Sequence, residues 1–287
     1  MTMTLSRDGF LSEQINALAD EALRAYCPGH TALVDRINRF AIATMIVPRD
    51  IQQRDADLFA VTLLGRAIQD FEAAVLLAAR GLRAQSRTMV RSTFETALYC
   101  MAAARDIVLS QGAKIKPKKG EVPTTRFVDA FEGGHQRFRG QVAAEIRSMP
   151  NVPVETGAAL EDLIDEIGTP GKHQDIDLHG LAADLGLSNL YTVVYRPLSQ
   201  DAHPSALSLQ HHVEVNAEGK ITGLRIGPDY LQFADTLELA ACSLLVALDG
   251  FMERFGTPEE KAKLSALTNA YRELHEADPD HPVETVV

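Results

Sequence analysis

The chain has 287 residues, of which 46 % are hydrophobic and 23 % are charged. These fractions are ordinary for a folded protein and exclude an intrinsically disordered one, which has too few apolar residues to form a core. The formal net charge of −11 disfavours non-specific attachment to nucleic acid or to an anionic membrane, because both need a positive protein surface. Any contact with nucleic acid is therefore expected to be local.

Cysteine use and apolar runs indicate the compartment. Cys27, Cys100 and Cys242 are odd in number and far apart, so neither a disulfide framework nor a thiolate metal site is indicated. The first seven residues lack the features of a secretory signal, and no stretch approaches the roughly 20 apolar residues of a membrane-spanning helix. The sequence predicts a cytoplasmic protein without a membrane partner.

Helical periodicity dominates the first hundred residues. Apolar residues recur at three- and four-residue steps from Leu11 to Tyr26 and from Leu33 to Val47, which predicts two amphipathic helices separated at Pro28. Two longer helices are expected on either side of a break at Gly81. We expect these two to form an antiparallel hairpin at the centre of the core.

The middle of the chain alternates loops with shorter helices. The segment Ser110–Thr125 has no apolar face, and its four lysines lie between Lys114 and Lys119, so we expect a loop whose role the sequence does not indicate. Helices are predicted at Phe127–Met149 and Gly157–Ile167. Two more, at Leu178–Leu185 and Asn189–Tyr195, are expected to follow the N-cap residues Asp177 and Ser188.

The last third of the chain contains the only predicted strands. Apolar residues on both sides of a polar turn predict a β-hairpin within 211–226. Pro228 suits the first turn of a helix that ends at Gly256, and Thr257 suits the cap of a last helix that runs to about His275. We therefore predict an all-α antiparallel helical bundle with one small β-hairpin, divided into an N-terminal helical pair at 1–56, a core domain at 57–275 and a disordered tail at 276–287.

Polar residues suited to chemistry gather in one predicted helix. Arg196, Ser199, Gln200 and His203 would share a face of it. Arginine can bind a phosphate bidentately, and histidine titrates near neutral pH and can transfer the protons of a phosphodiester cleavage. Pro197 cannot donate its backbone hydrogen bond, so the helix should kink or restart there.

The same residues also have a structural interpretation. Arg196 and Asp201 can satisfy each other and the backbone groups freed near Pro197. Arg91 and Glu95 lie one turn apart beside the apolar stripe of the central helix. They form either a simple intrahelical ion pair or, if partly buried, a network that reaches the Tyr195–His203 face.

Metal sites are weakly indicated. Four potential ligands alternate along one segment: His173, Asp175, Asp177 and His179. Asp177, however, is expected to cap a helix. Glu132 and His135 resemble half of a di-iron carboxylate motif and lack the second copy that such bundles need. No glycine-rich phosphate loop, nucleophile elbow or Cys-x-x-Cys pair occurs, and we expect neither a metal nor a cofactor.

Two motifs lie about a hundred residues apart: Arg91-Ser92-x-x-Glu95, and Tyr195-Arg196-x-x-Ser199-x-x-x-His203-Pro204-Ser205. In them the chain resembles a widespread bacterial family of helical proteins of unknown function, over roughly Asp57 to Phe255. A more distant similarity is to the HEPN superfamily, whose ribonucleases carry an arginine followed a few residues later by a histidine. That similarity implies a helical homodimer with a toxin or antiviral role, although Pro197 occupies a position that is usually polar there.

Two hypotheses follow. The first is a HEPN-like, metal-independent ribonuclease that acts on RNA as a homodimer, with His203 as general acid or base and Arg196 as phosphate clamp. Its expected catalytic residues are Arg196, His203, Ser199 and Tyr195, and its expected binding residues are Arg91, Glu95 and Asp201. The second is a non-enzymatic helical protein that binds or regulates a protein partner, in which the same cluster is a structural polar network.

Overall fold

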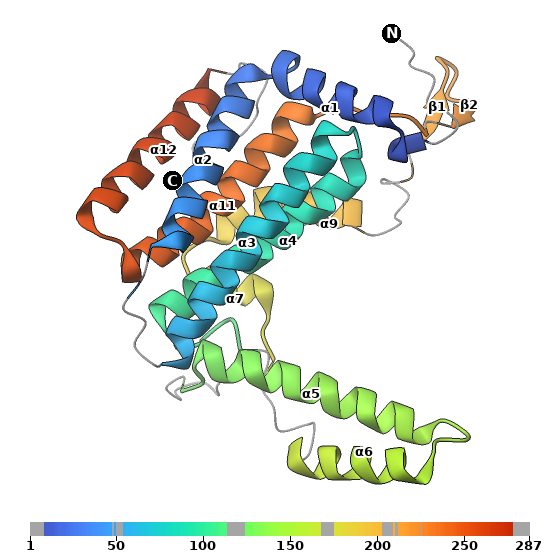
Figure 1. Ribbon diagram of the computed structural model, residues 1–287, viewed down its shortest axis with the longest axis vertical. Coiled ribbons are helices and arrows are strands. Elements are labelled where there is room, and N and C mark those ends of the chain that lie inside the picture. Colours follow the sequence, from blue (N-terminus) through green and yellow to red (C-terminus); the bar gives the residue numbers. More distant parts are fainter. Residues whose placement is uncertain are drawn as a thin grey trace. The chain divides into compact units, whose positions relative to one another are not determined.

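The computed structural model describes residues 9–47, 49, 54–113, 124–167, 175–202, 209, 212–224 and 226–277. Within them the fold is helical with one small two-stranded hairpin, as predicted (Figure 1). By packing, the chain forms two units, Met1–Arg105 with Asn189–Val287, and Asp106–Ser188. The boundaries predicted from the sequence remain a prediction, and each unit is described by itself.

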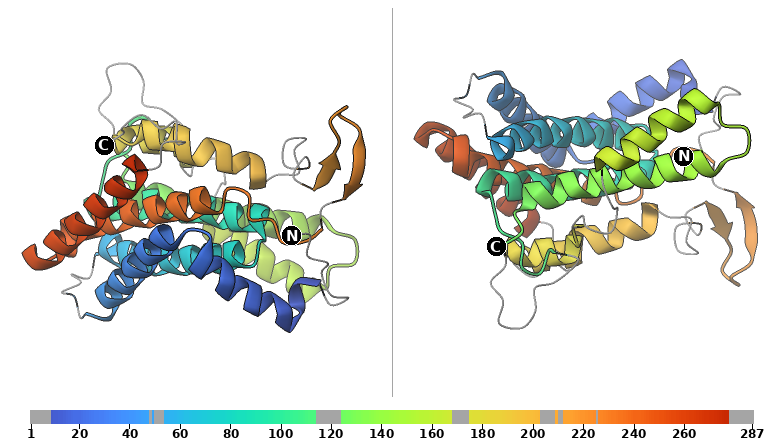
Figure 2. Two further views of the ribbon diagram at one scale, coloured as in Figure 1. Left: turned by 90° about the horizontal axis from the view of Figure 1, so that it is seen from above. Right: turned by 90° about the horizontal axis from the view of Figure 1, so that it is seen from below.

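Three long helices form the core of the first unit. These are α3 (Asp55–Ala79), α4 (Arg83–Arg105) and α11 (Phe233–Phe255), which lie side by side in all views (Figures 1 and 2). Their contact faces are apolar and buried, and the largest side chains among them include Phe71, Phe94 and Phe251. Helices α3 and α4 form the predicted hairpin, because Gly81 adopts a positive φ of 71° between them that glycine tolerates without strain.

Helix α11 begins later than predicted. It starts at Phe233 and not at Pro228, because Pro228 packs against the turn at Gly81. A Cβ at Gly81 would lie 2.6 Å from Cβ of Pro228, and the backbone N–H of Asp229 donates to the Gly81 carbonyl at 2.9 Å. This tertiary contact holds Pro228 outside the helix, and the chain enters α11 through the left-handed residue Gln232.

The other helices of this unit lie outside that core. Helix α1 spans Glu13–Ala25, and α2 spans Pro28–Ile46, so Pro28 opens a helix at the position where a missing N–H costs least. Helix α12 (Pro258–Glu276) packs against α2 and α11. Its predicted cap is confirmed: the Thr257 hydroxyl accepts from the Glu260 amide, while the Glu260 side chain accepts from the Thr257 amide.

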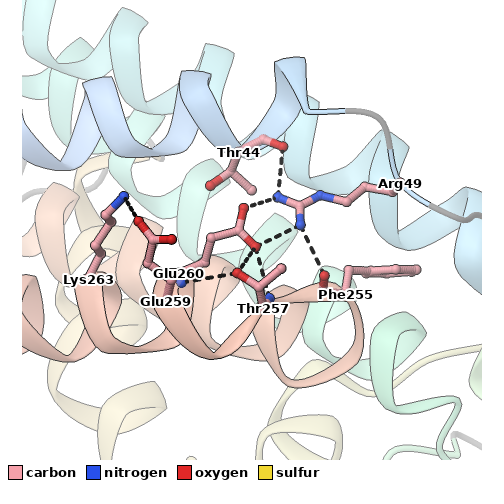
Figure 3. A network of polar contacts seen from close by, with 7 residues as sticks. All are labelled: Thr44, Arg49, Phe255, Thr257, Glu259, Glu260 and Lys263. Carbon is pink, nitrogen blue, oxygen red and sulfur yellow. Dashed lines mark hydrogen bonds and ion pairs between the residues drawn. The ribbon is translucent and has the colours of Figure 1, made fainter.

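Arg49 joins the ends of three helices (Figure 3). Its guanidinium donates to both carboxylate oxygens of Glu260, at 2.8 and 2.6 Å, and to the backbone carbonyls of Phe255 and Thr44, at 3.0 and 3.2 Å. The Arg49 side chain is only 9 % exposed. The arginine, helped by the Thr257 cap, lowers the pKa of Glu260 to about 2, so this carboxylate is charged throughout the neutral range.

The second unit contains α5 (Phe127–Ser148), α6 (Val154–Ile167) and α7 (Leu178–Asp184). Helices α5 and α6 run antiparallel (Figure 1), and the glycine pair at 133 and 134 does not interrupt α5. Asp177 stands at the N-cap of α7, but its side chain makes no capping hydrogen bond. The predicted capping contact is therefore wrong, although the predicted start of the helix is correct.

The two strands are β1 (Val213–Val215) and β2 (Ile221–Leu224), which pair antiparallel around the predicted turn.

All three cysteines are buried free thiols, and burial raises the pKa of each to about 11 or 12. They behave as small apolar side chains, as expected. No helix among the described residues is long and apolar enough to span a membrane. The lysine loop, 114–119, lies outside the described residues.

Candidate functional site

The candidate site lies where a short irregular helix packs against α4. The chain passes from α8 (Ser188–Leu190) through a π-helix, η3 (Tyr191–Tyr195), into α9 (Arg196–Ala202). Ser188 is the first residue of α8 and not its cap. Pro197 is the second residue of α9, and the chain is helical without interruption from 188 to 202; the helix changes there from π to α instead of restarting, and the π-turn was not predicted. Such turns are rare and frequently accompany functional sites.

Helix α4 supports this segment with a polar stripe along one side. The stripe repeats every four residues, which places its members on one helix face: Arg83, Arg87, Arg91, Glu95 and Tyr99. Of these five residues, only Arg91 and Glu95 were predicted from the sequence. The four-residue spacing was the signal that would have identified the other three.

Arg91 is the centre of the network. Its Nε donates to the hydroxyl of Ser199 at 3.1 Å, and its Nη2 donates to the hydroxyl of Tyr195. The guanidinium also lies 4.7 Å from the Tyr195 ring centre and 3.7 Å from Glu95. Convergence of Arg91, Glu95, Tyr195 and Ser199 is thereby confirmed. The fifth predicted member, His203, lies outside the described residues.

Tyr195 is held as a neutral hydroxyl. Its ring is buried against Phe94 and stacked on Tyr191, while its hydroxyl accepts from Arg91 and donates to Glu95 at 3.4 Å. Burial raises the pKa of this hydroxyl, the charge of Glu95 raises it further, and Arg91 partly opposes both. Tyr195 therefore contributes a fixed hydrogen bond rather than a titrating group at neutral pH.

A second contact fastens α9 to α4. Nε of Arg87 donates to the carboxylate of Asp201 at 2.5 Å, and the two side chains are only 9 % and 7 % exposed. A buried pair of this kind is costly to break on one side, because the remaining charge is left without its partner. Asp201 was predicted as a ligand-binding group or as a partner of Arg196. The structure pairs it with Arg87 and not with Arg196, and its role in ligand binding stays a prediction.

Arg196 differs from the other arginines around α9. Its side chain is exposed, and it makes no hydrogen bond or ion pair with the residues that the structure describes. Ser199 contacts α4, since its hydroxyl accepts from Arg91, and it also donates to the Tyr195 carbonyl at 3.0 Å. Arg196 and Ser199 are three residues apart in α9, as their predicted common face requires, but only Ser199 takes part in the contact with α4.

The weakly indicated metal sites find no support among the described residues. No group of three or more histidine, cysteine, aspartate or glutamate side chains there has the arrangement of a metal site. Asp175, one of the four alternating residues, binds Arg137 of α5, and His173 lies outside the described part of the chain.

A comparison with protein families matches residues 57–221 to a family described as of unknown function, DUF5677. The match covers more than half of the chain. The chain belongs to DUF5677. Both the polar stripe of α4 and the η3–α9 segment fall inside the DUF5677 match, as do Arg91, Glu95, Tyr195, Arg196 and Ser199. No curated protein and no solved structure matches the chain.

Proposed function

We propose that the α4–α9 site is that of a metal-independent, HEPN-like endoribonuclease of the toxin or antiviral-defence type. The proposal rests on a difference among the arginines around α9. Arg87 and Arg91 are engaged in holding α9, whereas Arg196 is exposed on that same helix. An exposed guanidinium on a rigid support is suited to bind a phosphate bidentately.

In this proposal Arg196 holds the scissile phosphate and His203 moves the protons. The histidine removes the proton of a ribose 2′-hydroxyl, whose oxygen attacks the phosphorus, and a proton is returned to the departing 5′-oxygen. Arg91, Glu95, Tyr195 and Ser199 act as positioning residues, because they hold the η3–α9 junction against α4. The net negative charge of the protein restricts RNA binding to this local site.

The proposal is tested by incubating purified protein with single-stranded RNA. We expect cleavage that survives EDTA and that falls by about 10²- to 10⁴-fold in His203→Ala, the usual contribution of an acid–base group. Arg196→Lys should also be impaired, since lysine keeps the charge but loses the planar fork. A folded wild-type protein that cleaves none of the RNAs offered would refute the proposal.

A second candidate is a non-enzymatic protein that binds or regulates a protein partner. It is favoured by the completeness of the network, because the hydroxyls of Tyr195 and Ser199 each donate and accept within it. A complete network can serve stability alone. In that case His203→Ala should lower the melting temperature while neither the variant nor the wild type cleaves RNA.

A further inference from the structure

Helix α5 has two different faces. One faces α6: Gly140 and Ala143 are buried there, and Arg147, two turns after Gly140, pairs with Glu161 of α6 at 2.5 Å. The opposite face carries large apolar side chains in solvent. Phe138 is 62 % exposed and Met149, which follows the helix directly, is 52 % exposed. Helix α6 therefore leaves an apolar face of α5 uncovered.

The uncovered face has the spacing of a helix-packing seam. Its positions alternate steps of four and three residues, which keeps those within α5 in line along a helix that packs on another. The last position, Met149, directly follows α5 in extended conformation, and the first, Phe131, is half-buried against Phe127. We call these positions the α5 seam: Phe131, His135, Phe138, Val142, Glu145 and Met149. Four are apolar, and the two polar ones, one imidazole and one carboxylate, occupy matching places at equal distances from the centre of the seam.

We infer that the α5 seam binds the α5 seam of a second copy of this chain, antiparallel and about a two-fold axis near residue 140. A two-fold contact must be complementary to itself. In this register Phe131 faces Met149 of the second copy, and Phe138 faces Val142 of the second copy. His135 faces Glu145 of the second copy, so each polar residue meets its complement, and every contact occurs twice.

The charges around the α5 seam favour a second copy of the chain over a membrane surface or an unrelated helix. A membrane surface is disfavoured because α6, which accompanies α5, is strongly acidic and carries no basic residue, and anionic lipids would repel it. An unrelated apolar helix would leave His135 and Glu145 without partners at the seam, whereas a second copy satisfies both. One like-charge approach remains, between Arg139 and its own counterpart, at an exposed rim where screening keeps the cost small.

The experiment measures the mass of the full chain in solution by light scattering and sedimentation at tens of micromolar. The wild type should be a dimer. Phe138→Glu, which places a carboxylate against Val142 of the second copy, should weaken the dimer by at least ~100-fold. The matched control is Leu76→Glu, which alters an apolar side chain that is 55 % exposed on α3 and should leave the dimer unchanged.

A charge exchange tests the same contact without placing a charge in the apolar part of the seam. His135→Glu alone sets carboxylate against carboxylate twice, and Glu145→Lys alone sets lysine against histidine twice, so each variant should be mainly monomeric. An equal mixture of the two should restore a dimer, because one polar contact then joins the new carboxylate to the new lysine and the other is the original contact between His135 and Glu145. A monomeric wild type, or a dimer that all three seam variants leave intact, would overturn the inference.

Discussion

Two arginines in the first unit, Arg49 and Arg91, each form a network of hydrogen bonds, but the two networks differ in their partners and in their exposure. Arg49 is 9 % exposed, and its donors meet a carboxylate and two backbone carbonyls at the ends of three helices. Arg91 is 26 % exposed and meets only side chains, those of Ser199, Tyr195 and Glu95. The partners of Arg49 lie at helix termini. The network of Arg91 is closer to the surface, and its member Tyr195 directly precedes the exposed Arg196.

This difference indicates whether a polar cluster has a structural or a functional role. When a carboxylate and backbone carbonyls at helix ends use most of a guanidinium's donors, as around Arg49, the fold explains the cluster. Around Arg91 the same forces hold a short helix that contains a π-turn, and the fold leaves the adjacent cation at Arg196 unexplained. We therefore expect substitutions in the Arg49 network to change stability alone, and those around Arg91 to change both stability and activity.

The largest stability effect is expected at Arg49. Arg49→Met keeps an apolar stem but leaves Glu260 and two carbonyls without their donors, which should cost about 3 kcal/mol of unfolding free energy. Urea unfolding followed by circular dichroism measures it. The control is Arg39→Met, because Arg39 forms an exposed i,i+4 pair with Asp35 that is worth a few tenths of a kcal/mol. Equal losses in both variants would contradict the assignment.

The next effect is a loss of stability in acid. The folded pKa of Glu260 is depressed to about 2 from 4.5, so its stabilising contribution is complete above pH 4.5 and disappears as the pH falls toward 2. The shift corresponds to about 3 kcal/mol. Unfolding free energies measured at several pH values should fall less steeply over this window in Glu260→Gln. A variant whose acid dependence matches that of the wild type would show that other carboxylates dominate.

A smaller loss is expected at Arg91. Arg91→Met removes hydrogen bonds to two hydroxyls at a half-exposed position, so the unfolding free energy should fall by about 1–2 kcal/mol. The proposed function predicts that RNA cleavage falls as well, because the η3–α9 junction loosens. Both quantities can be measured on one sample. A loss of stability with full retention of cleavage would show that the network does not position Arg196.

The smallest effect is expected at Ser199. Its hydroxyl links Arg91 to the Tyr195 carbonyl, and the half-exposed site lets water replace much of that link. Ser199→Ala should therefore cost only about 0.5–1 kcal/mol and reduce cleavage less than Arg91→Met does. A complete loss of cleavage in a stable Ser199→Ala would instead give the hydroxyl a direct chemical role.

The sequence predicted what local periodicity and helix caps determine. The α3–α4 hairpin, the β-hairpin and the Thr257 cap follow from apolar spacing and first-turn chemistry, and all appear. The approach of Arg91 to Tyr195 was predicted from the cost of leaving a charge without partners at a core edge. These inferences need only neighbouring residues or one general rule about buried charge.

The features that the sequence did not predict depend on contacts between residues far apart in the chain. Asp201 could form an ion pair with either Arg87 or Arg196. It pairs with Arg87 because α9 packs on α4. Similarly, Pro228 carries a good helix-start signal, yet the turn at Gly81 holds it outside α11. The π-turn before Arg196 has no local signature, and the hydrogen bond that joins Ser199 to Arg91 depends on the packing of α9 on α4.

If Arg196 serves RNA and not the fold, a paired measurement on Arg196→Ala separates the two roles. The unfolding free energy should change by less than about 0.5 kcal/mol, as for other exposed substitutions. Cleavage of single-stranded RNA by the same sample should fall by roughly 100-fold or more, the usual loss when one charge-stabilising donor is removed. An Arg196→Ala protein that cleaves RNA as fast as the wild type, or a wild type without any cleavage, would contradict the account.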